Sequence, residues 1–217
     1  MRPKHLAMAL SKLTPHPCVD VSLEQYATEG DLAAYWMLAV DQLDGLEGRN
    51  VADLGAGNGI LGIGALMLGA SHVLFVEADP AAAAVLEENL AGLDEGMAAR
   101  ASVLTARVGR DDVPFAQTDL IIMNPPWGVQ QAKADRPFME LALDTNVEAI
   151  HVLHSDHAAH LEPMAGEAGW NGEVVLRTTF RLPPTYAHHA QRKGTTDVKC
   201  WRFFREGNAK LDSEPDE

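Results

Sequence analysis

Short apolar runs alternate along this chain with longer segments in which apolar residues recur every three to four positions. The segment 32–43 shows the second pattern, because its apolar side chains fall on one face of a helix. This periodicity predicts a short helix within residues 1–17 and helices over 32–43, 59–68, 80–91, 137–145 and 156–168. The short runs predict strands at 51–54, 73–77, 102–106, 119–123, 148–153, 173–181 and 196–204.

The order of these elements predicts an α/β fold. Strands that alternate with helices form βαβ units, which build a mostly parallel sheet. The last two strands have no strong helical pattern between them, so we expect an antiparallel hairpin at one edge of the sheet. With 217 residues, of which 47% are hydrophobic, the chain is long enough to form one domain with a sizeable core.

A glycine-rich turn follows the first strand that the pattern predicts. Gly55, Gly57 and Gly59 occupy alternate positions after Asp53, whereas a dinucleotide-binding turn has its glycines in the pattern G-x-G-x-x-G. The spacing D-x-G-x-G-x-G is typical of turns that bind S-adenosylmethionine. Glycine lets the backbone approach the ligand closely, and Asp53 would face the charged methionine amine.

Two more strand ends carry candidate ligand-binding groups. Glu77 ends the strand 73–77, about twenty residues beyond the glycines, where a carboxylate can accept hydrogen bonds from ribose hydroxyls. The alternative for Glu77 is a solvated strand end. The strand 119–123 runs into the tetrapeptide Asn124-Pro125-Pro126-Trp127.

This tetrapeptide is suited to hold a planar group that bears an amino nitrogen. The Asn124 side-chain oxygen and the Pro125 carbonyl can each accept a hydrogen bond from the amino group. The prolines fix their own φ angles and remove local donors, while Trp127 offers a flat face for stacking. Such a loop fits methyl transfer to adenine or to a glutamine amide, and a rigid turn after a strand is the alternative.

Ligands of open α/β sheets bind outside the carboxyl ends of the strands, where the strand order reverses. Gly55, Glu77 and Asn124 all stand at the carboxyl ends of predicted strands. We therefore expect them to converge on one cleft.

The net charge of −14 is unfavourable for binding a polyanion. Basic residues are concentrated between Arg177 and Arg202, while the residues 206–217 form an acidic tail that is poor in apolar side chains. A locally basic surface on an acidic body can still guide a nucleic-acid backbone, and an ordinary solvated face fits the composition equally well. The tail is expected to be disordered.

The cysteines and the hydropathy indicate the compartment. Cys18 and Cys200 have neither the spacing of metal ligands nor that of a disulfide framework, which suits a reducing cytoplasm. No apolar stretch reaches the roughly 18 residues of a membrane span, and the N-terminus lacks a signal-peptide core. We expect a cytoplasmic protein without a membrane partner.

Four histidines recur every three residues, at His151, His154, His157 and His160. A metal site would need them on one face. Because the segment is predicted to pass from strand to helix, they should point in different directions, and no metal site is expected.

The motifs resemble, in their order, those of the methyltransferase-like protein 5 family, adenine-N6 methyltransferases of small-subunit ribosomal RNA. The resemblance covers about residues 5 to 204 and rests on the segments 23–28, 53–61, 67–70, 122–128 and 182–189. The tetrapeptide alone is shared by many amino-methyltransferases. Two further motifs make the resemblance considerably more specific. They are Glu24-Gln25-Tyr26-x-Thr28, before the glycine turn, and Leu182-Pro183-x-x-Tyr186, after the tetrapeptide.

The resemblance implies a class I methyltransferase with a Rossmann-like sheet and S-adenosylmethionine as cofactor. The domains would be a helical lead-in and cofactor lid over 1–48, the methyltransferase domain over 49–205 and the disordered tail over 206–217. Relatives can depend on a small zinc-binding activator protein that adds to a sheet edge, so such a partner is a candidate besides RNA.

The resemblance also assigns roles to residues. Cofactor contacts are implied for Gln25, Tyr26, Thr28, Asp53, Gly55, Ala56, Gly57, Asn58, Ile60, Glu77, Ala78, Ala106 and Asn124. Catalysis is implied for Asn124, Pro125, Pro126 and Trp127, and RNA contacts for Trp127, His188, His189, Arg192 and Lys193. Many such enzymes have an acidic residue after the third strand, where this chain has Ala106 and Arg107, so the backbone there would hold the cofactor adenine.

Three alternatives remain at the level of sequence. A protein-glutamine N5 methyltransferase uses the same tetrapeptide, usually with Tyr, but tends to carry an N-terminal domain for which about fifty residues are too few. A DNA adenine methyltransferase would want an inserted recognition domain. A noncatalytic S-adenosylmethionine-binding scaffold would not need both the glycine turn and the tetrapeptide.

Overall fold

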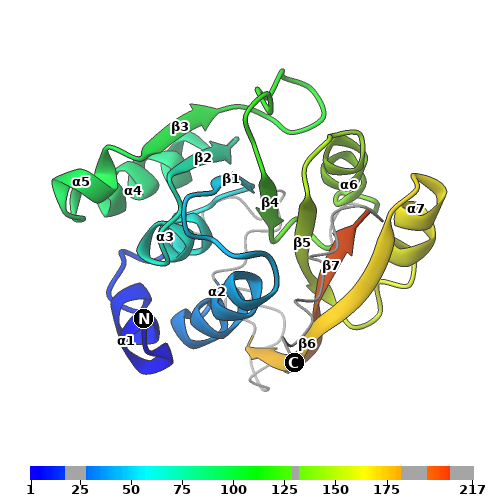
Figure 1. Cartoon of the computed structure of the whole chain (residues 1–217), viewed down its shortest axis with the longest axis horizontal. Helices are drawn as coiled ribbons and strands as arrows, with labels where there is room; N and C mark the ends of the chain where they lie inside the picture. The colour runs from blue at the N-terminus through cyan, green and yellow to red at the C-terminus, as the bar shows by residue number, and fades with distance from the viewer. Residues whose placement is uncertain (18–27, 129–131, 182–194, 206–217) are drawn as a thin grey trace, which may run out of the picture.

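The computed structural model describes residues 1–17, 28–128, 132–181 and 195–205, which form one seven-stranded sheet with helices on both faces (Figure 1). The helices are α1 (Pro3–Leu10), α2 (Gly30–Asp44), α3 (Ile60–Met67), α4 (Pro80–Ala91), α5 (Glu95–Ala98), α6 (Arg136–Leu143) and α7 (Leu161–Glu167). The strands are β1 (Asn50–Leu54), β2 (His72–Glu77), β3 (Ala101–Thr105), β4 (Leu120–Met123), β5 (Ala149–Ser155), β6 (Asn171–Arg181) and β7 (Thr195–Phe204). Within these described ranges, no helix combines the length and the apolar character needed to cross a membrane.

The strand order in the sheet is β3-β2-β1-β4-β5-β7-β6. The strands from β3 to β5 pair in parallel, and β7 pairs antiparallel with both β5 and β6. The predicted parallel sheet with an antiparallel hairpin at one edge is therefore confirmed. Because β2 lies on one side of β1 and β4 on the other, the strand order reverses between β1 and β4, which is where such sheets bind ligands.

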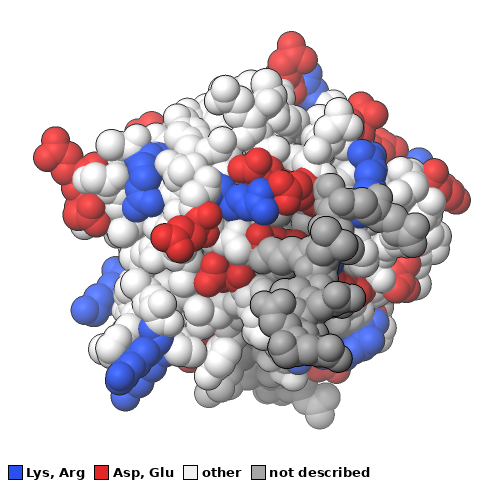
Figure 2. Space-filling view, in the orientation of Figure 1, with Lys and Arg blue, Asp and Glu red and all other residues white. Residues whose placement is uncertain are grey.

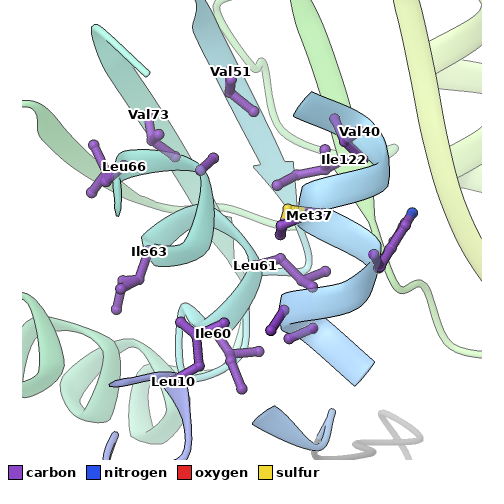
Figure 3. Close-up of a cluster of buried hydrophobic side chains, with 14 of the residues drawn as sticks. Leu10, Met37, Val40, Val51, Ile60, Leu61, Ile63, Leu66, Val73 and Ile122 are labelled. Atoms are coloured by element: carbon purple, nitrogen blue, oxygen red, sulfur yellow. The ribbon is translucent and has the colours of Figure 1, made fainter. Parts of the chain in front are cut away.

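Alternating residues along the strands separate two buried clusters. Val51, Val73 and Ile122 belong to a cluster that contains side chains of α1 to α4, while Ala52 and Ile121 belong to the other, with side chains of α6 and α7. Successive strand residues point to opposite faces, so each cluster fills one face of the sheet. Figure 3 shows the first cluster, in which residues of α2 and α3 meet those of β1, β2 and β4.

The N-terminal lead-in is part of this core. Leu6 and Leu10 of α1, together with Trp36 and Met37 of α2, are at most 1% exposed and lie in the same cluster as Ile63 of α3. The first helices therefore stabilise the face of the sheet on which the glycine turn continues into α3.

The predicted elements agree with the structure to within two residues at each end, apart from one helix start and one short helix. The helix predicted over 156–168 begins only at Leu161, because β5 continues to Ser155, which pairs with Val198 of β7, and the backbone amide of Asp156 bonds to Asp197. The short helix α5 was not expected from periodicity. It is a single turn whose N-terminus is capped by Asp94, because the Asp94 side chain accepts a hydrogen bond from the Met97 amide.

A buried ionic cluster ties α2 to the C-terminal hairpin. Asp44 accepts a hydrogen bond from His151 Nε2 at 2.7 Å, and from Arg202 Nη2 at 2.6 Å and Nε at 2.9 Å. Arg202 also donates to Glu173 of β6 at 2.9 Å. Burial alone would raise the pKa of Asp44, but the hydrogen bonds from His151 and Arg202 outweigh it and lower the pKa to about 2.

Replacing Asp44 with alanine should destabilise the fold strongly. The change leaves the Arg202 charge and the His151 ring without their shared acceptor, and removing one partner of a buried pair typically costs about 3–5 kcal/mol. Urea unfolding of Asp44→Ala at pH 7 measures this loss. The control is Glu140→Gln, which removes an exposed ion pair with Arg136 and should cost about 0–1 kcal/mol; equal stability of the two variants would contradict the role of the cluster.

Candidate active site

A cleft of about 290 Å³ opens at the carboxyl ends of the central strands β1 to β4. Its lining combines the glycine turn after β1, the acidic end of β2, the residues after β3 and the tetrapeptide after β4. Of the predicted cofactor residues, these line the cleft: Thr28, Gly55, Ala56, Gly57, Asn58, Ile60, Glu77, Ala78, Ala106 and Asn124. The convergence expected from the strand ends is therefore present in the structure.

The glycine turn has a backbone that requires glycine. The φ angles of Gly55, Gly57 and Gly59 are 71°, 57° and 84°, in the left-handed region that other residues rarely adopt. Gly59 is the N-cap of α3, and a Cβ added there would come within 2.3 Å of a Leu86 methyl group. The turn thus fits tightly between the sheet and α4 while its outer side borders the cleft.

Glu77 links β2 to this turn. Its carboxylate accepts from the Gly57 amide at 2.8 Å and from the Asp79 amide at 2.8 Å. Burial raises the pKa of Glu77 more than these backbone hydrogen bonds lower it. A buried acidic group at the end of β2 is suited to accept hydrogen bonds from the hydroxyls of a bound ribose.

Asp53 lies beneath the turn instead of lining the cleft. It is 1% exposed, and its Oδ2 accepts from the Gly62 amide at 2.9 Å, at the start of α3. Among the described residues, its Oδ1 is buried without a hydrogen-bond partner. Burial is the main reason that the pKa of Asp53 rises to about 7.

These observations agree with a ligand such as S-adenosylmethionine. Two acidic side chains, Asp53 and Glu77, lie close to a backbone turn that has no bulky side chains. Glu77 lines the cleft and can contact a ligand directly, whereas Asp53 lies beneath the turn, where the positive charge of a methionine amine or sulfonium in the cleft would favour its ionised form. Ala106 and Arg107 both line the cleft, and the backbone contacts to the cofactor adenine stay a prediction.

In the tetrapeptide Asn124-Pro125-Pro126-Trp127, here called the acceptor loop, hydrogen bonds fix both ends of the Asn124 side-chain amide. Nδ2 of Asn124 donates to Thr28 Oγ1 at 3.2 Å, and Oδ1 accepts from the indole Nε1 of Trp127 at 3.1 Å. Pro125 is buried, whereas Asn124, Pro126 and Trp127 are partly exposed. Asn124 and Pro126 line the cleft, so the tetrapeptide borders the same space as the glycine turn.

Sequence reasoning missed several lining residues. His16 lies against the glycine turn, since a Cβ at Gly57 would come within 2.8 Å of its Cδ2, and burial lowers the pKa of its ring. The backbone carbonyl of Thr14 holds this segment in place by accepting from Asn58 and Asn89 at 3.0 Å each. The other missed lining residues include Arg110, Lys133, Pro137 and Phe138. No local motif marks them, because they reach the cleft from α6 and from loops.

Some predicted residues lie outside the described part of the chain. These are Gln25 and Tyr26 of the cofactor set, His188, His189, Arg192 and Lys193 of the RNA set, and the tail 206–217. Their proposed roles stay predictions.

The expectation for the four histidines is partly wrong. His151 faces Asp44, but the side chains of His154 and His160 both face Asp135 and come together with it. The two histidines converge because β5 ends at Ser155 and a turn brings His160 back over Asp135 before α7 begins.

Ionisation of Asp53 should make the unliganded protein less stable as the pH rises. A carboxyl whose pKa is raised from 3.8 to about 7 by folding stabilises the folded state fully below pH 4, and that contribution is lost as the pH rises through 7. Asp53→Asn keeps an acceptor for the Gly62 amide and cannot ionise. Urea unfolding at pH 5.5 and pH 8 should therefore show a larger loss of stability in the wild type than in Asp53→Asn; identical losses would contradict the raised pKa.

Comparison with known proteins identifies the family. Residues 29–162 match the family model of the methyltransferase small domain. The chain is 32% identical to the rRNA N(6)-adenosine-methyltransferase Mettl5 of Drosophila melanogaster, over 84% of this chain and 87% of the fly protein. It is 27% identical to rRNA N(6)-adenosine-methyltransferase METTL5 of Danio rerio, over 94% of this chain and 99% of the zebrafish protein.

A solved structure extends the similarity to three dimensions. The crystal structure of a Pyrococcus horikoshii protein assigned as an RNA methyltransferase superposes with a TM-score of 0.81 and 34% identity, covering 94% of this chain and 96% of the archaeal one. With the family model, the relatives and the cleft in agreement, this chain belongs to the METTL5-like family of methyltransferases.

Proposed function

We propose that this protein transfers a methyl group from S-adenosylmethionine to N6 of an adenine in ribosomal RNA. The relatives that match most of its length carry that activity in their names. The single observation that carries the proposal is that Asn124 lines the same cleft as the glycine turn and Glu77. A donor pocket and an amino-binding loop are thereby joined in one space.

The polar groups of the acceptor loop can activate the amino group of the target adenine. The N6 lone pair of adenine is delocalised into the ring, so the nitrogen is a poor nucleophile. Hydrogen bonds from its two N–H groups to Asn124 Oδ1 and to the Pro125 carbonyl would favour a tetrahedral nitrogen and stabilise the positive charge that develops on it. Because Thr28 and Trp127 hold both ends of the Asn124 amide, the acceptor oxygen is oriented before the base arrives.

When bound, S-adenosylmethionine supplies a methyl group on a sulfonium, which is already a good leaving centre. The protein mainly has to align the reacting atoms, and good alignment can contribute roughly 7–11 kcal/mol. The target base must be unpaired or flipped out of its helix to reach Asn124, and a single-stranded loop of RNA makes this less costly. As N6 gains the methyl group, the S–CH3 bond breaks and the sulfur leaves as a neutral thioether. The methylated nitrogen is then strongly acidic and loses one proton to water, so no strong base is required of the protein.

We propose small-subunit rRNA as the RNA that is methylated, on the basis of the sequence resemblance. On the face shown in Figure 2, basic and acidic side chains are interspersed, so a continuous basic track for RNA is not supplied by the described residues of that face. We propose the basic residues at 188–193 and a small zinc-binding activator on a sheet edge as further contributors to RNA binding. The proposed location is the cytoplasm.

Asn124→Ala should abolish most of the methyl transfer. Losing one preorganised group that stabilises the developing charge typically lowers kcat about 100- to 1,000-fold. The measurement is transfer of labelled methyl from S-adenosylmethionine to protein-free small-subunit rRNA, followed by digestion and detection of N6-methyladenosine. Binding of S-adenosylmethionine, measured by calorimetry, should be largely retained.

The matched control is Asn146→Ala, because Asn146 is exposed and lies away from the cleft lining. Its transfer rate should equal that of the wild type. If wild-type protein labels a release factor on glutamine but not rRNA, the adenine assignment is wrong. If it binds S-adenosylmethionine and labels neither acceptor, with or without a zinc-binding activator, the noncatalytic scaffold is favoured.

Glu77→Gln should weaken binding of S-adenosylmethionine. A charged hydrogen-bond acceptor contributes about 1.5–3 kcal/mol, so Kd should rise about 10- to 100-fold. Calorimetric titration measures the change, and Glu87→Gln on the exposed face of α4 is the control that should bind like the wild type. Unchanged affinity of Glu77→Gln would remove Glu77 from the cofactor site.

A further inference from the structure

A cluster of polar side chains lies behind the acceptor loop. Asp135, the N-cap residue of α6, has its Oδ2 3.1 Å from His154 Nε2 and 2.5 Å from His160 Nε2. Asp135 and His154 are 3% and 1% exposed, whereas the His160 side chain is 53% exposed. The three residues come from the start of α6, the end of β5 and the N-cap of α7.

The hydrogen bonds of His154 fix its tautomer. The Ser155 amide donates to His154 Nδ1 at 2.8 Å, so Nδ1 carries the lone pair and the ring proton is on Nε2. That proton is donated to Asp135. Nε2 then has no lone pair for a metal ion, so the cluster acts as a hydrogen-bond relay although its ligand atoms lie within 4.8 Å of one another.

Asp135 is the charged acceptor of this relay. Burial would raise the pKa of Asp135, but the hydrogen bonds from His154 and His160 outweigh it and lower the pKa. A carboxylate that accepts from two rings holds both more firmly than a neutral acceptor would, because charge-assisted hydrogen bonds are about twice as strong.

His154 in turn supports the aromatic residue of the tetrapeptide. The rings of Trp127 and His154 are stacked, with centroids 6.0 Å apart and planes 27° from parallel, which is within the range of favourable aromatic pairs. The other end of the indole reaches the catalytic amide, since Trp127 Nε1 donates to Asn124 Oδ1 at 3.1 Å. Phe or Tyr at this position could stack but could not donate that hydrogen bond.

We propose that Asp135 and His154 are positioning residues for methyl transfer. They fix the plane of the Trp127 indole, and the indole N–H fixes the Asn124 amide with one lone pair of Oδ1 turned toward Trp127 and the second left for the amino group of the substrate. This inference rests on the proposed function, because it assigns Asn124 as the group that accepts from the target amine.

Steady-state kinetics of His154→Ala test the inference. Misplacement of a reacting group by about 1 Å can cost about 100-fold in rate, so kcat should fall about 10- to 100-fold while KM for rRNA and Kd for S-adenosylmethionine change little. His154→Phe, which keeps a ring against Trp127, should recover part of the rate. Asp135→Asn should also lower kcat, and His157→Ala, an exposed change in the same segment, should leave it unchanged.

A double-mutant cycle shows whether His154 acts through Trp127. Trp127→Phe should lower kcat by itself, and adding His154→Ala should then have a much smaller effect than in the wild type. Fully multiplicative effects would overturn the inference, as would an unchanged kcat in both His154→Ala and Asp135→Asn. Loss of activity of the isolated chain in EDTA, restored by Zn²⁺, would overturn it in favour of a metal site.

A measurement without turnover separates this inference from the proposed function. The chain has four tryptophans, so ¹⁵N-tryptophan labelling gives four indole signals, and Trp127→Phe identifies one of them. That signal should shift in His154→Ala and in Asp135→Asn, and stay in place in His157→Ala. If it shifts while wild-type protein methylates no RNA, the relay stands and the proposed function fails; if it stays in place in all three variants, the relay itself is wrong.

Discussion

The site depends on the pairing of β1 with β2 on one side and with β4 on the other. Because these pairs are parallel, the chain leaves every one of these strands at the same edge of the sheet. Gly55, Glu77 and Asn124 are far apart in sequence, yet each is the first or last residue at such an edge. A ligand bound over β1 can therefore contact the glycine turn and the tetrapeptide after β4 together.

Three buried carboxyl groups show how position sets their chemistry. Asp44 contacts a histidine and an arginine, and its pKa is lowered. Asp53 and Glu77 accept only from backbone amides among the described residues, and burial raises the pKa of both. The first group stabilises the fold through an ion pair. Glu77 lines the cleft and is suited to accept hydrogen bonds from the hydroxyls of a ligand, whereas Asp53 lies beneath the glycine turn.

The lead-in contributes to both the core and the cleft. Helices α1 and α2 fill one face of the sheet, and the segment after α1 places His16 against Gly57. Thr28, just before α2, holds the Asn124 amide. Parts of the chain that precede the glycine turn thus line the cleft at that turn and hold the Asn124 amide of the tetrapeptide.

Local patterns in the sequence were sufficient for the strands, the glycine turn, the tetrapeptide and the C-terminal hairpin, because periodicity, glycine spacing and proline act over a few residues. The position of Glu77 in the cleft was predicted from its spacing after the glycines. Contacts between residues distant in the sequence could not be predicted in this way. The Asp44 carboxylate meets His151 and Arg202 across 107 and 158 positions, and Asp135 gathers His154 and His160 only because β5 pairs with β7 as far as Ser155. Periodicity records which face a side chain takes, whereas the partner on that face is decided by the packing of the whole sheet.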